Sequence, residues 1–465
     1  MSTNKEQKWY TRIPHPVTML FGIIILATLM SHILPAGEYA RKLVNGRQQV
    51  IPGTFEYIDA SPIGLLDMFT AMAKGFKQAS DIIWVIFTSG VMFGILQKTK
   101  MVENAVGTII KKLGLKRKYL IVFILTYLFG MLGVAVGYEN NIAMIPIGAM
   151  LSLALGGDLI LAAGISVAAI TVGFGLSPIN PYTVGTGHQI AELPMFSGAG
   201  LRSALCFLAL TLLALYNVRY FKKITENGET GIGQDLDETG FSLNKPIGDY
   251  QMDAKSYFVA AVFISGMIIM LYGIFEHKWY LKEIAAIFAM ICIACGIVAR
   301  MSATKIGETA LQSIALVAPG AFMVGFATTI KVILEQGQIS DTIAFNLSEV
   351  LVSLPIYVSA IVMSLSQCVM NIMIPSGSGQ ALATLPVMIP VGDLVGLTRQ
   401  TTILAFQIGD GVTNLINPTL GGLIAMLSLC RVPFDRWLRY ITPLLVLILI
   451  GCWIFLTIAV FIGWK

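Results

Sequence analysis

The chain has 465 residues, a net charge of +5 and a mean hydropathy of +0.77, with 56% hydrophobic and only 12% charged residues. Soluble proteins carry roughly 25% charged residues, so this composition excludes an ordinary soluble domain. A spanning helix needs about 20 apolar residues, so the long apolar runs predict an all-α polytopic membrane protein with about 10–12 transmembrane helices. The runs are 17–35, 79–96, 119–136, 159–178, 201–218, 256–274, 284–299, 316–334, 355–374 and 441–462.

Loop charges orient the first part of the chain. The first run, 17–35, is too long for a signal peptide and lacks a convincing small-residue cleavage site, so we expect a retained span. Residues 98–118 carry seven Lys or Arg and one Glu, which predicts that this loop is cytoplasmic. The N-terminus is then expected to be cytoplasmic too. The positive net charge fits such loops, and no nucleic-acid partner is expected.

Two segments of the first half interrupt their apolar runs with Gly, Pro and amides. The segment 137–158, GYENNIAMIPIGAMLSLALGGD, predicts a re-entrant hairpin, with a turn at the end of a span as the alternative. The segment 173–189, GFGLSPINPYTVGTGHQ, breaks a helix at Asn-Pro and frees carbonyls. Such breaks bind ions or substrate in secondary transporters, although Asn and Ser also serve polar helix packing. The candidate ligands are Glu139, Asn140, Asn141, Ser177 and Asn180.

A second half follows a polar linker and repeats the first. Ile-Asn-Pro recurs at 179–181 and 416–418, and two further similarities share an offset of 237–239 residues. The extra apolar run 284–299 and the loop 335–354, which has three acids and no Lys or Arg, predict that the second half is inverted. We expect a first transport repeat at 1–220, a polar cytoplasmic linker at 221–254 and a second transport repeat at 255–465.

The second half contains a matching pair of interrupted segments. Residues 371–393, NIMIPSGSGQALATLPVMIPVGD, predict a second hairpin whose glycines present N–H groups to a ligand. Residues 407–422, QIGDGVTNLINPTLGG, contain the second Asn-Pro break. The candidate substrate or ion ligands here are Asn371, Ser376, Ser378, Gln380, Gln407, Asp410, Thr413, Asn414 and Asn417.

Two acids at these breaks are the sharpest signal, because a carboxylate at a helix centre costs about 2.5–3.5 kcal/mol. Glu139 and Asp410 are expected to hold a cationic substrate group or a coupling ion. Asp158 and Asp393 end their hairpins and suit capping, while Lys331 is expected to reach the interface and His188 to make ordinary hydrogen bonds. Walker A and G-x-S-x-G motifs are missing, so an enzyme is not expected, nor is a metal cluster or cofactor beyond Na⁺ or H⁺.

The stretch IPSGSGQALATLPVMIPVGDLVGLTRQTTILAFQIGDGVTNLINPT, followed by CRVPFDRWLRY, resembles the YfcC family of basic amino-acid antiporters. This family is similar to the anaerobic C4-dicarboxylate carriers within the ion-transporter superfamily. The resemblance implies a bacterial inner-membrane carrier. Many members have Glu-Glu where this chain has Glu139-Asn140. This difference leaves open that the substrate is a zwitterionic or anionic amino acid. A second Asn-Pro, at 417–418, also departs from some members.

The resulting hypothesis is a secondary active transporter of amino acids, including basic ones such as arginine or ornithine, working by exchange or cation coupling. The alternative is a carrier of C4-dicarboxylates or other carboxylates. A receptor would need a sizeable soluble domain, and a channel would not need two occluding hairpins. The expected partners are a small-molecule substrate and the lipid bilayer, and a homodimer is left open.

Overall fold

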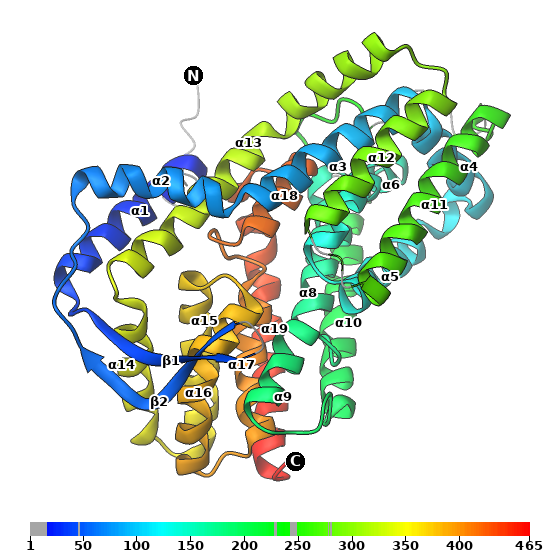
Figure 1. Cartoon of the computed structure of the whole chain (residues 1–465). Helices are drawn as coiled ribbons and strands as arrows, with labels where there is room; N and C mark the ends of the chain where they lie inside the picture. The colour runs from blue at the N-terminus through cyan, green and yellow to red at the C-terminus, as the bar shows by residue number, and fades with distance from the viewer. Residues whose placement is uncertain (1–15, 45–46, 227–229, 242–248, 278, 280) are drawn as a thin grey trace, which may run out of the picture.

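The computed structural model describes residues 16–465 apart from 45–46, 227–229, 242–248, 278 and 280. This part is mostly helical, with one antiparallel pair of strands (Figure 1). The elements of the first half are α1 (Pro16–Ile33), β1 (Gly37–Val44), β2 (Arg47–Tyr57), α2 (Leu65–Gln78), α3 (Ser80–Lys98), α4 (Met101–Leu113), η2 (Leu115–Arg117), α5 (Lys118–Val136), η3 (Glu139–Met144), α6 (Ile145–Ala154), α7 (Leu159–Ala163), η4 (Gly164–Ala168), α8 (Ala169–Gly175), η5 (Pro181–Gly185), α9 (Thr186–Ile190) and α10 (Ala199–Thr225).

The second half is built from longer helices. They are α11 (Ala254–His277), α12 (Leu281–Val298), α13 (Ala303–Gln336), α14 (Ser340–Val352), α15 (Ile356–Met373), α16 (Gly377–Val395), α17 (Arg399–Thr413), α18 (Gly421–Leu429) and α19 (Phe434–Phe461). In the described residues, seven helices are long and apolar enough to cross a membrane, or eight if the two arms of the bent α13 form one span. The predicted all-helical polytopic fold class is confirmed, and the β1–β2 hairpin is an addition to it.

The helices of the two halves correspond in order and spacing. Helix α15 begins at Ile356, 238 residues after α5 begins at Lys118, and α16 begins at Gly377, 238 residues after η3 begins at Glu139. The pairs α4 and α14, α8 and α17, and α10 and α19 follow the same order. The first half carries the β1–β2 hairpin where the second half has the extra helix α12, which matches the additional run predicted to invert the second repeat.

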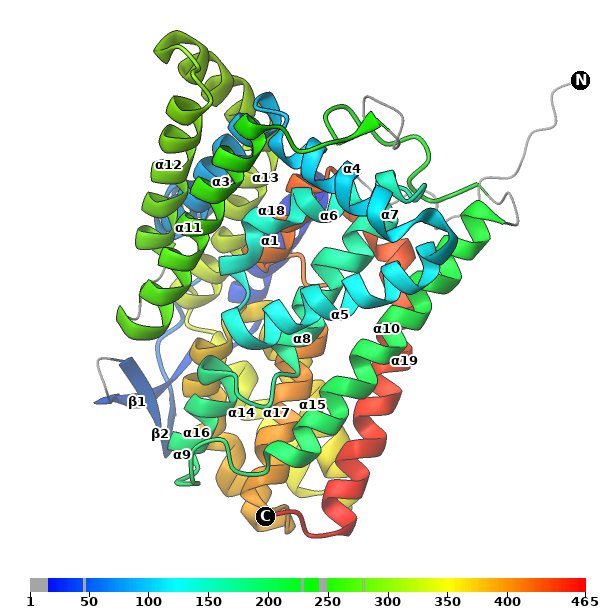
Figure 2. The same ribbon diagram turned by 90° about the vertical axis from the view of Figure 1, so that its right-hand side faces the viewer.

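The corresponding helices α10 and α19 pack against each other in opposite directions (Figure 2). The Tyr216 ring lies 5.2 Å from the Tyr440 ring, and at the other end of α10 the Arg202 guanidinium lies 4.7 Å from the Trp464 ring. Residue numbers therefore fall along α10 as they rise along α19. Antiparallel packing of equivalent helices is the arrangement that inverted repeats require.

The two halves meet most closely where α8 ends and α17 passes it. A Cβ atom added to Gly175 would lie 2.6 Å from the carbonyl oxygen of Gly411, and one on Gly411 would lie 2.5 Å from that of Gly175. Only glycine permits this approach of two backbones. Because this contact between the two repeats is reciprocal, the pseudo-two-fold axis passes close to it.

Each repeat contains one helical hairpin beside this axis. In the second, α15 and α16 are joined by hydrogen bonds from Gln380 Nε2 to Gln367 Oε1 (2.8 Å) and from Thr384 Oγ1 to the same oxygen (3.0 Å). In the first, Phe129 of α5 lies beside Gly148 of α6. Both hairpins therefore begin earlier than predicted. Residues 137–144 form the turn of the first and the apolar run 119–136 supplies one arm, while the second, predicted at 371–393, has α15 as its first arm.

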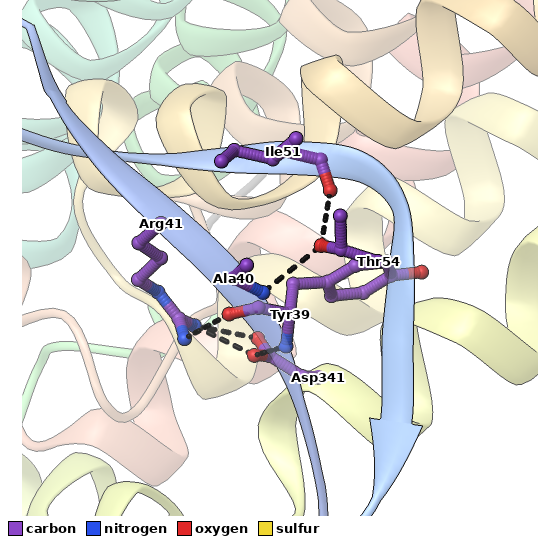
Figure 3. Close-up of polar contacts among 6 residues, drawn as sticks. All are labelled: Tyr39, Ala40, Arg41, Ile51, Thr54 and Asp341. Atoms are coloured by element: carbon purple, nitrogen blue, oxygen red, sulfur yellow. Dashed lines mark hydrogen bonds and ion pairs between the residues drawn. The ribbon is translucent and has the colours of Figure 1, made fainter.

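The β1–β2 hairpin is held to α14 by an ion pair, shown in Figure 3, and by a ring stack. Arg41 donates to both carboxylate oxygens of Asp341 at 2.8 and 2.7 Å, and the Tyr39 N–H donates to Asp341 at 3.0 Å. The Phe55 and Phe345 rings stack with centroids 4.2 Å apart. Since β2 also packs on α16, the hairpin ties α14 to one arm of the second helical hairpin.

The opposite half has an equivalent attachment. Tyr250, at the end of the linker, donates to Glu103 of α4 at 2.6 Å, and its ring lies over Gly107. Glu103 and Gly107 each precede their counterparts, Asp341 and Phe345, by 238 residues. Helices α4 and α14 are thus each held by a separate segment of chain at equivalent positions.

Candidate substrate and ion site

The two Asn-Pro motifs lie at the breaks, the first at the start of η5 and the second just before α18. Asn180 Oδ1 accepts from the Tyr182 N–H at 2.9 Å, while Asn180 Nδ2 donates to the Phe174 carbonyl at 2.9 Å. Asn417 Oδ1 accepts from the Thr419 N–H at 2.9 Å, and Asn417 Nδ2 donates to the Asn371 carbonyl at 2.9 Å. Asn180 is therefore the N-cap of η5. Asn417 instead closes a turn ahead of α18, whose N-cap is Leu420, and each asparagine side chain also ties its break to a neighbouring segment. This use favours a structural role over ligand binding for both.

Asp410 lies in α17 at the centre of the molecule and is 1% exposed. Neither carboxylate oxygen has a hydrogen-bond partner among the described residues. A Cβ atom on Gly377, the first residue of α16, would lie 3.4 Å from Asp410 Oδ2 and 2.6 Å from Thr183 Cγ2. The N-terminus of α16, the carboxylate and the Thr183 side chain thus converge from three separate segments.

The same region gathers further buried polar atoms without partners in the described structure. Asn371 donates to the Asp410 carbonyl and to Asn414 Oδ1, both at 2.8 Å, which leaves its own Oδ1 without a donor. Thr183 Oγ1 and Gln380 Oε1 are also buried without a hydrogen-bond partner in the described structure. Because buried polar groups are normally paired, this concentration of oxygen atoms is the chemistry expected of a cation site.

The tip of the second hairpin faces this cluster. Ser376 is exposed and caps α16, since its Oγ accepts from the Gly379 N–H at 3.3 Å. Ser378, two residues further on, is half-buried. The N-terminus of α16 carries partial positive charge and unpaired N–H groups, which suits an anion such as a carboxylate.

Glu139 stands at the turn of the first hairpin, on the other side of the pseudo-two-fold axis. Its Cγ would lie 3.6 Å from a Cβ atom on Gly422, at the start of α18. A row of three aromatic rings starts next to Glu139. The Tyr138 and Phe174 ring centroids lie 5.4 Å apart, and those of Phe174 and Tyr182 lie 6.4 Å apart. The row of rings ends at Tyr182, which precedes Thr183 in the chain. A row of aromatic rings beside an acid suits a cationic group.

Other predicted residues are occupied by contacts inside the protein. Asn141 Nδ2 donates to the carbonyls of Gly137 and Leu132 at 2.7 and 3.2 Å, and Ser177 Oγ donates to the Val134 carbonyl at 3.3 Å. These bonds hold α5 against the break after α8. Asn140 and Thr413 are buried beside the two acids.

Gln407 accepts a hydrogen bond from Arg202, a buried cation that the sequence analysis missed. Arg202 is 1% exposed and donates to Gln407 Oε1 at 3.1 Å and Gln400 Oε1 at 2.9 Å. Gln407 Nε2 in turn donates to the carbonyls of Gly175 and Ser177 at 3.2 and 2.9 Å. Gln407 therefore positions the break rather than facing a ligand. Arg202 begins an apolar run, so its sequence context indicates a helix end rather than a buried charge.

The remaining charged candidates have hydrogen-bond or ion-pair partners within the protein. Asp158 caps α7 by accepting from the Leu161 N–H at 2.8 Å and also accepts from Tyr220 at 2.6 Å. Asp393 pairs with Arg399 at 3.5 Å, and Lys331 pairs with Glu335 at 3.5 Å. His188 makes hydrogen bonds of an ordinary kind, to Gln400 and the Phe196 N–H. No group of three or more metal-ligating side chains occurs in the described residues.

Inverted repeats, two helical hairpins and polar breaks at their meeting point define a membrane transporter. Residues 13–461 match the model of the DcuC family, described as C4-dicarboxylate anaerobic carriers, and the chain belongs to this family. It is 29% identical to the Escherichia coli protein YfcC, whose name proposes basic amino acid antiport, and 26% identical to an uncharacterized protein of Haemophilus influenzae. Each alignment covers 97% of both chains. The predicted family resemblance is confirmed.

Two solved transporters are similar at a lower level. MtrF of Neisseria gonorrhoeae, named with a class of antimetabolite efflux pumps, is 20% identical with a TM-score of 0.45, over 97% of this chain and 96% of MtrF. YdaH of Alcanivorax borkumensis, described as a transporter of unusual topology, is 16% identical with a TM-score of 0.45, over 97% of this chain and 99% of YdaH.

Proposed function

We propose that this transporter moves amino acids across the bacterial inner membrane, and that the movement is coupled to a Na⁺ ion or proton held at Asp410. The observation that carries the proposal is the Asp410 carboxylate, whose two oxygens are buried without partners among the described residues. An uncompensated charge in this position is costly. A bound cation or a proton removes that cost, and Thr183 and Asn371 offer additional oxygen ligands.

The surroundings of the ion site support an amino acid as the substrate. The N-terminus of α16 with Ser378 offers N–H and hydroxyl groups to the substrate carboxylate. Glu139 and the row of aromatic rings offer an acid and ring faces to an ammonium or guanidinium group. Arg202 donates to Gln400 and Gln407 and keeps only Nη2 without a partner in the described structure. The two acids Glu139 and Asp410 therefore outnumber this one buried cation.

The alternative substrate, a C4-dicarboxylate, is favoured by the family description. It would use the α16 N-terminus, Ser376 and Ser378, with Asn140 and Asn141 at the opposite turn. In that case Glu139 would have no substrate group to bind, so the two hypotheses differ in the role of this residue.

Counterflow in proteoliposomes with Glu139→Gln distinguishes the two substrates. We expect labelled arginine or ornithine, but not succinate, to enter vesicles preloaded with the same compound. Glu139→Gln is expected to weaken apparent amino-acid affinity by about 100-fold, because losing one buried charge contact costs about 3 kcal/mol. Succinate counterflow that Glu139→Gln leaves unchanged would contradict the amino-acid proposal. Glu308→Gln, at an exposed ion pair on α13, is the control.

A further inference from the structure

A cavity of about 990 Å³ separates two groups of helices away from the proposed substrate site. Helices α1, α2, α3 and α13 form one wall, while α18 and the start of α19 form the other. Figure 1 shows α13 crossing the molecule diagonally, with α18 beside its middle. The volume is at the upper end of the roughly 300–1,000 Å³ range of small-molecule sites.

The cavity lies at the bend of α13. Its two arms, Ala303–Pro319 and Ala321–Gln336, meet at 40°. A proline inside a helix removes one backbone hydrogen bond and displaces the preceding turn, which produces such a bend. Ala315 and Ala318 on one arm and Ala321 on the other are small, so the bend leaves space that α18 does not fill.

The lining is suited to hydrocarbon. All side chains that line the cavity are apolar except Ser428 and Asp435, and apolar cavities do not hold ordered water. Phe322, one of the lining residues, is 45% exposed on the outer surface of α13. In a membrane, the cavity is therefore continuous with a surface that contacts acyl chains.

The polar end of the cavity carries charges suited to a headgroup. Asp435 lines the cavity, and Arg439 lies one turn along the same face of α19, 4.0 Å from the Asp435 carboxylate. The buried Arg439 Nε has no hydrogen-bond partner in the described structure. Arg436, in contrast, is engaged by Asp235 at 2.8 Å. Arg439 lies just outside the cavity lining and its side chain is 32% exposed, so its guanidinium offers a charged donor to a phosphate beside the cavity.

We propose that this cavity binds a phospholipid, whose acyl chains lie between α13 and α18 and whose phosphate contacts Arg439. The bound lipid fills the space between the two groups of helices and keeps them apart. The proposal concerns a site separate from the transport site and does not depend on the transported substrate.

Binding of palmitoyl-oleoyl phosphatidylglycerol to the delipidated full chain tests the proposal. Native mass spectrometry would count bound lipid, and the melting temperature would report its stabilising effect. Ala318→Trp fills the cavity and is expected to weaken lipid binding about tenfold, equivalent to about 1.4 kcal/mol. Ala261→Trp, on the exposed face of α11, is the matched control and is expected to bind lipid as the unmodified chain does.

Arg439→Gln is the second variant, which tests the headgroup without changing the apolar walls. We expect it to remove the preference for phosphatidylglycerol over phosphatidylethanolamine. Equal binding by Ala318→Trp and the unmodified chain, or equal weakening in both tryptophan variants, would overturn the proposal in favour of non-specific surface lipid. If Ala318→Trp altered the monomer–dimer ratio without affecting lipid binding, the cavity would be a contact for a second copy and the proposal would be wrong.

Discussion

Replacing Asp410 by asparagine is expected to abolish coupled transport in a chain that remains folded. Asparagine has a similar size but can neither carry a proton at this position nor neutralise a bound cation. Breaking a buried charge pair costs about 3–5 kcal/mol, so uptake driven by an ion gradient should fall at least about 100-fold. The measurement is initial uptake into proteoliposomes under imposed Na⁺ and proton gradients.

The stability of the Asp410 variant gives an independent result. In Na⁺-free buffer, Asp410→Asn should melt at or above the temperature of the unmodified chain, because it removes a buried acid without partners. Its melting temperature should no longer respond to Na⁺ or pH in the way that the unmodified protein does. The control is Asp393→Asn, which alters a half-exposed acid paired with Arg399. Undiminished uptake by Asp410→Asn would exclude the assigned ion site.

Gly411→Ala is expected to have the largest effect on stability. The added Cβ would lie 2.5 Å from the Gly175 carbonyl oxygen, and this backbone atom can move only if α8 and α17 separate. Overpacking typically costs about 1–3 kcal/mol, which outweighs the gain of about 1 kcal/mol for replacing a helical glycine by alanine. We expect a lower melting temperature and a loss of transport.

Gly200→Ala is the matched control for this substitution. Gly200 lies in α10 and a Cβ atom there would meet nothing within 4 Å, so the substitution should be neutral or stabilising by up to about 1 kcal/mol. If Gly411→Ala melted at the same temperature as Gly200→Ala, the close approach of the two repeats would not contribute to stability.

Much of the architecture was predictable because membrane insertion and repetition leave strong sequence patterns. The offset of the Ile-Asn-Pro motifs predicts the equivalence of helices that the structure contains, and the extra run 284–299 corresponds to α12. The exact boundaries of the repeats and linker stay predictions, as do the coupling ion and a homodimer. The β1–β2 hairpin was missed although its sequence carries a signal, because the dipeptide Asn45-Gly46 is typical of two-residue hairpin turns.

The candidate site was harder to predict, since the same residue types bind ligands in some sites and form hydrogen bonds to the backbone in others. Asn180 and Asn417 have the sequence context of ion ligands, yet the Asn180 side chain caps η5 and the Asn417 side chain closes a turn ahead of α18. Gln407 is engaged by Arg202, whose burial has no local signature. Asp410 differs because its carboxylate lacks partners among the described residues. Gln367, four residues before Asn371 on the same face of α15, was missed because it lies within an otherwise apolar run.

The most direct test of the central claim is the melting temperature of the detergent-purified, unmodified protein, measured with and without Na⁺ and at several pH values. Amino acids and C4-dicarboxylates are added separately under each condition. A ligand that binds the native state stabilises it by mass action. We expect an amino acid to raise the melting temperature, and Na⁺ or a lower pH to increase that shift. A shift produced only by dicarboxylates, or one independent of both Na⁺ and pH, would contradict the account.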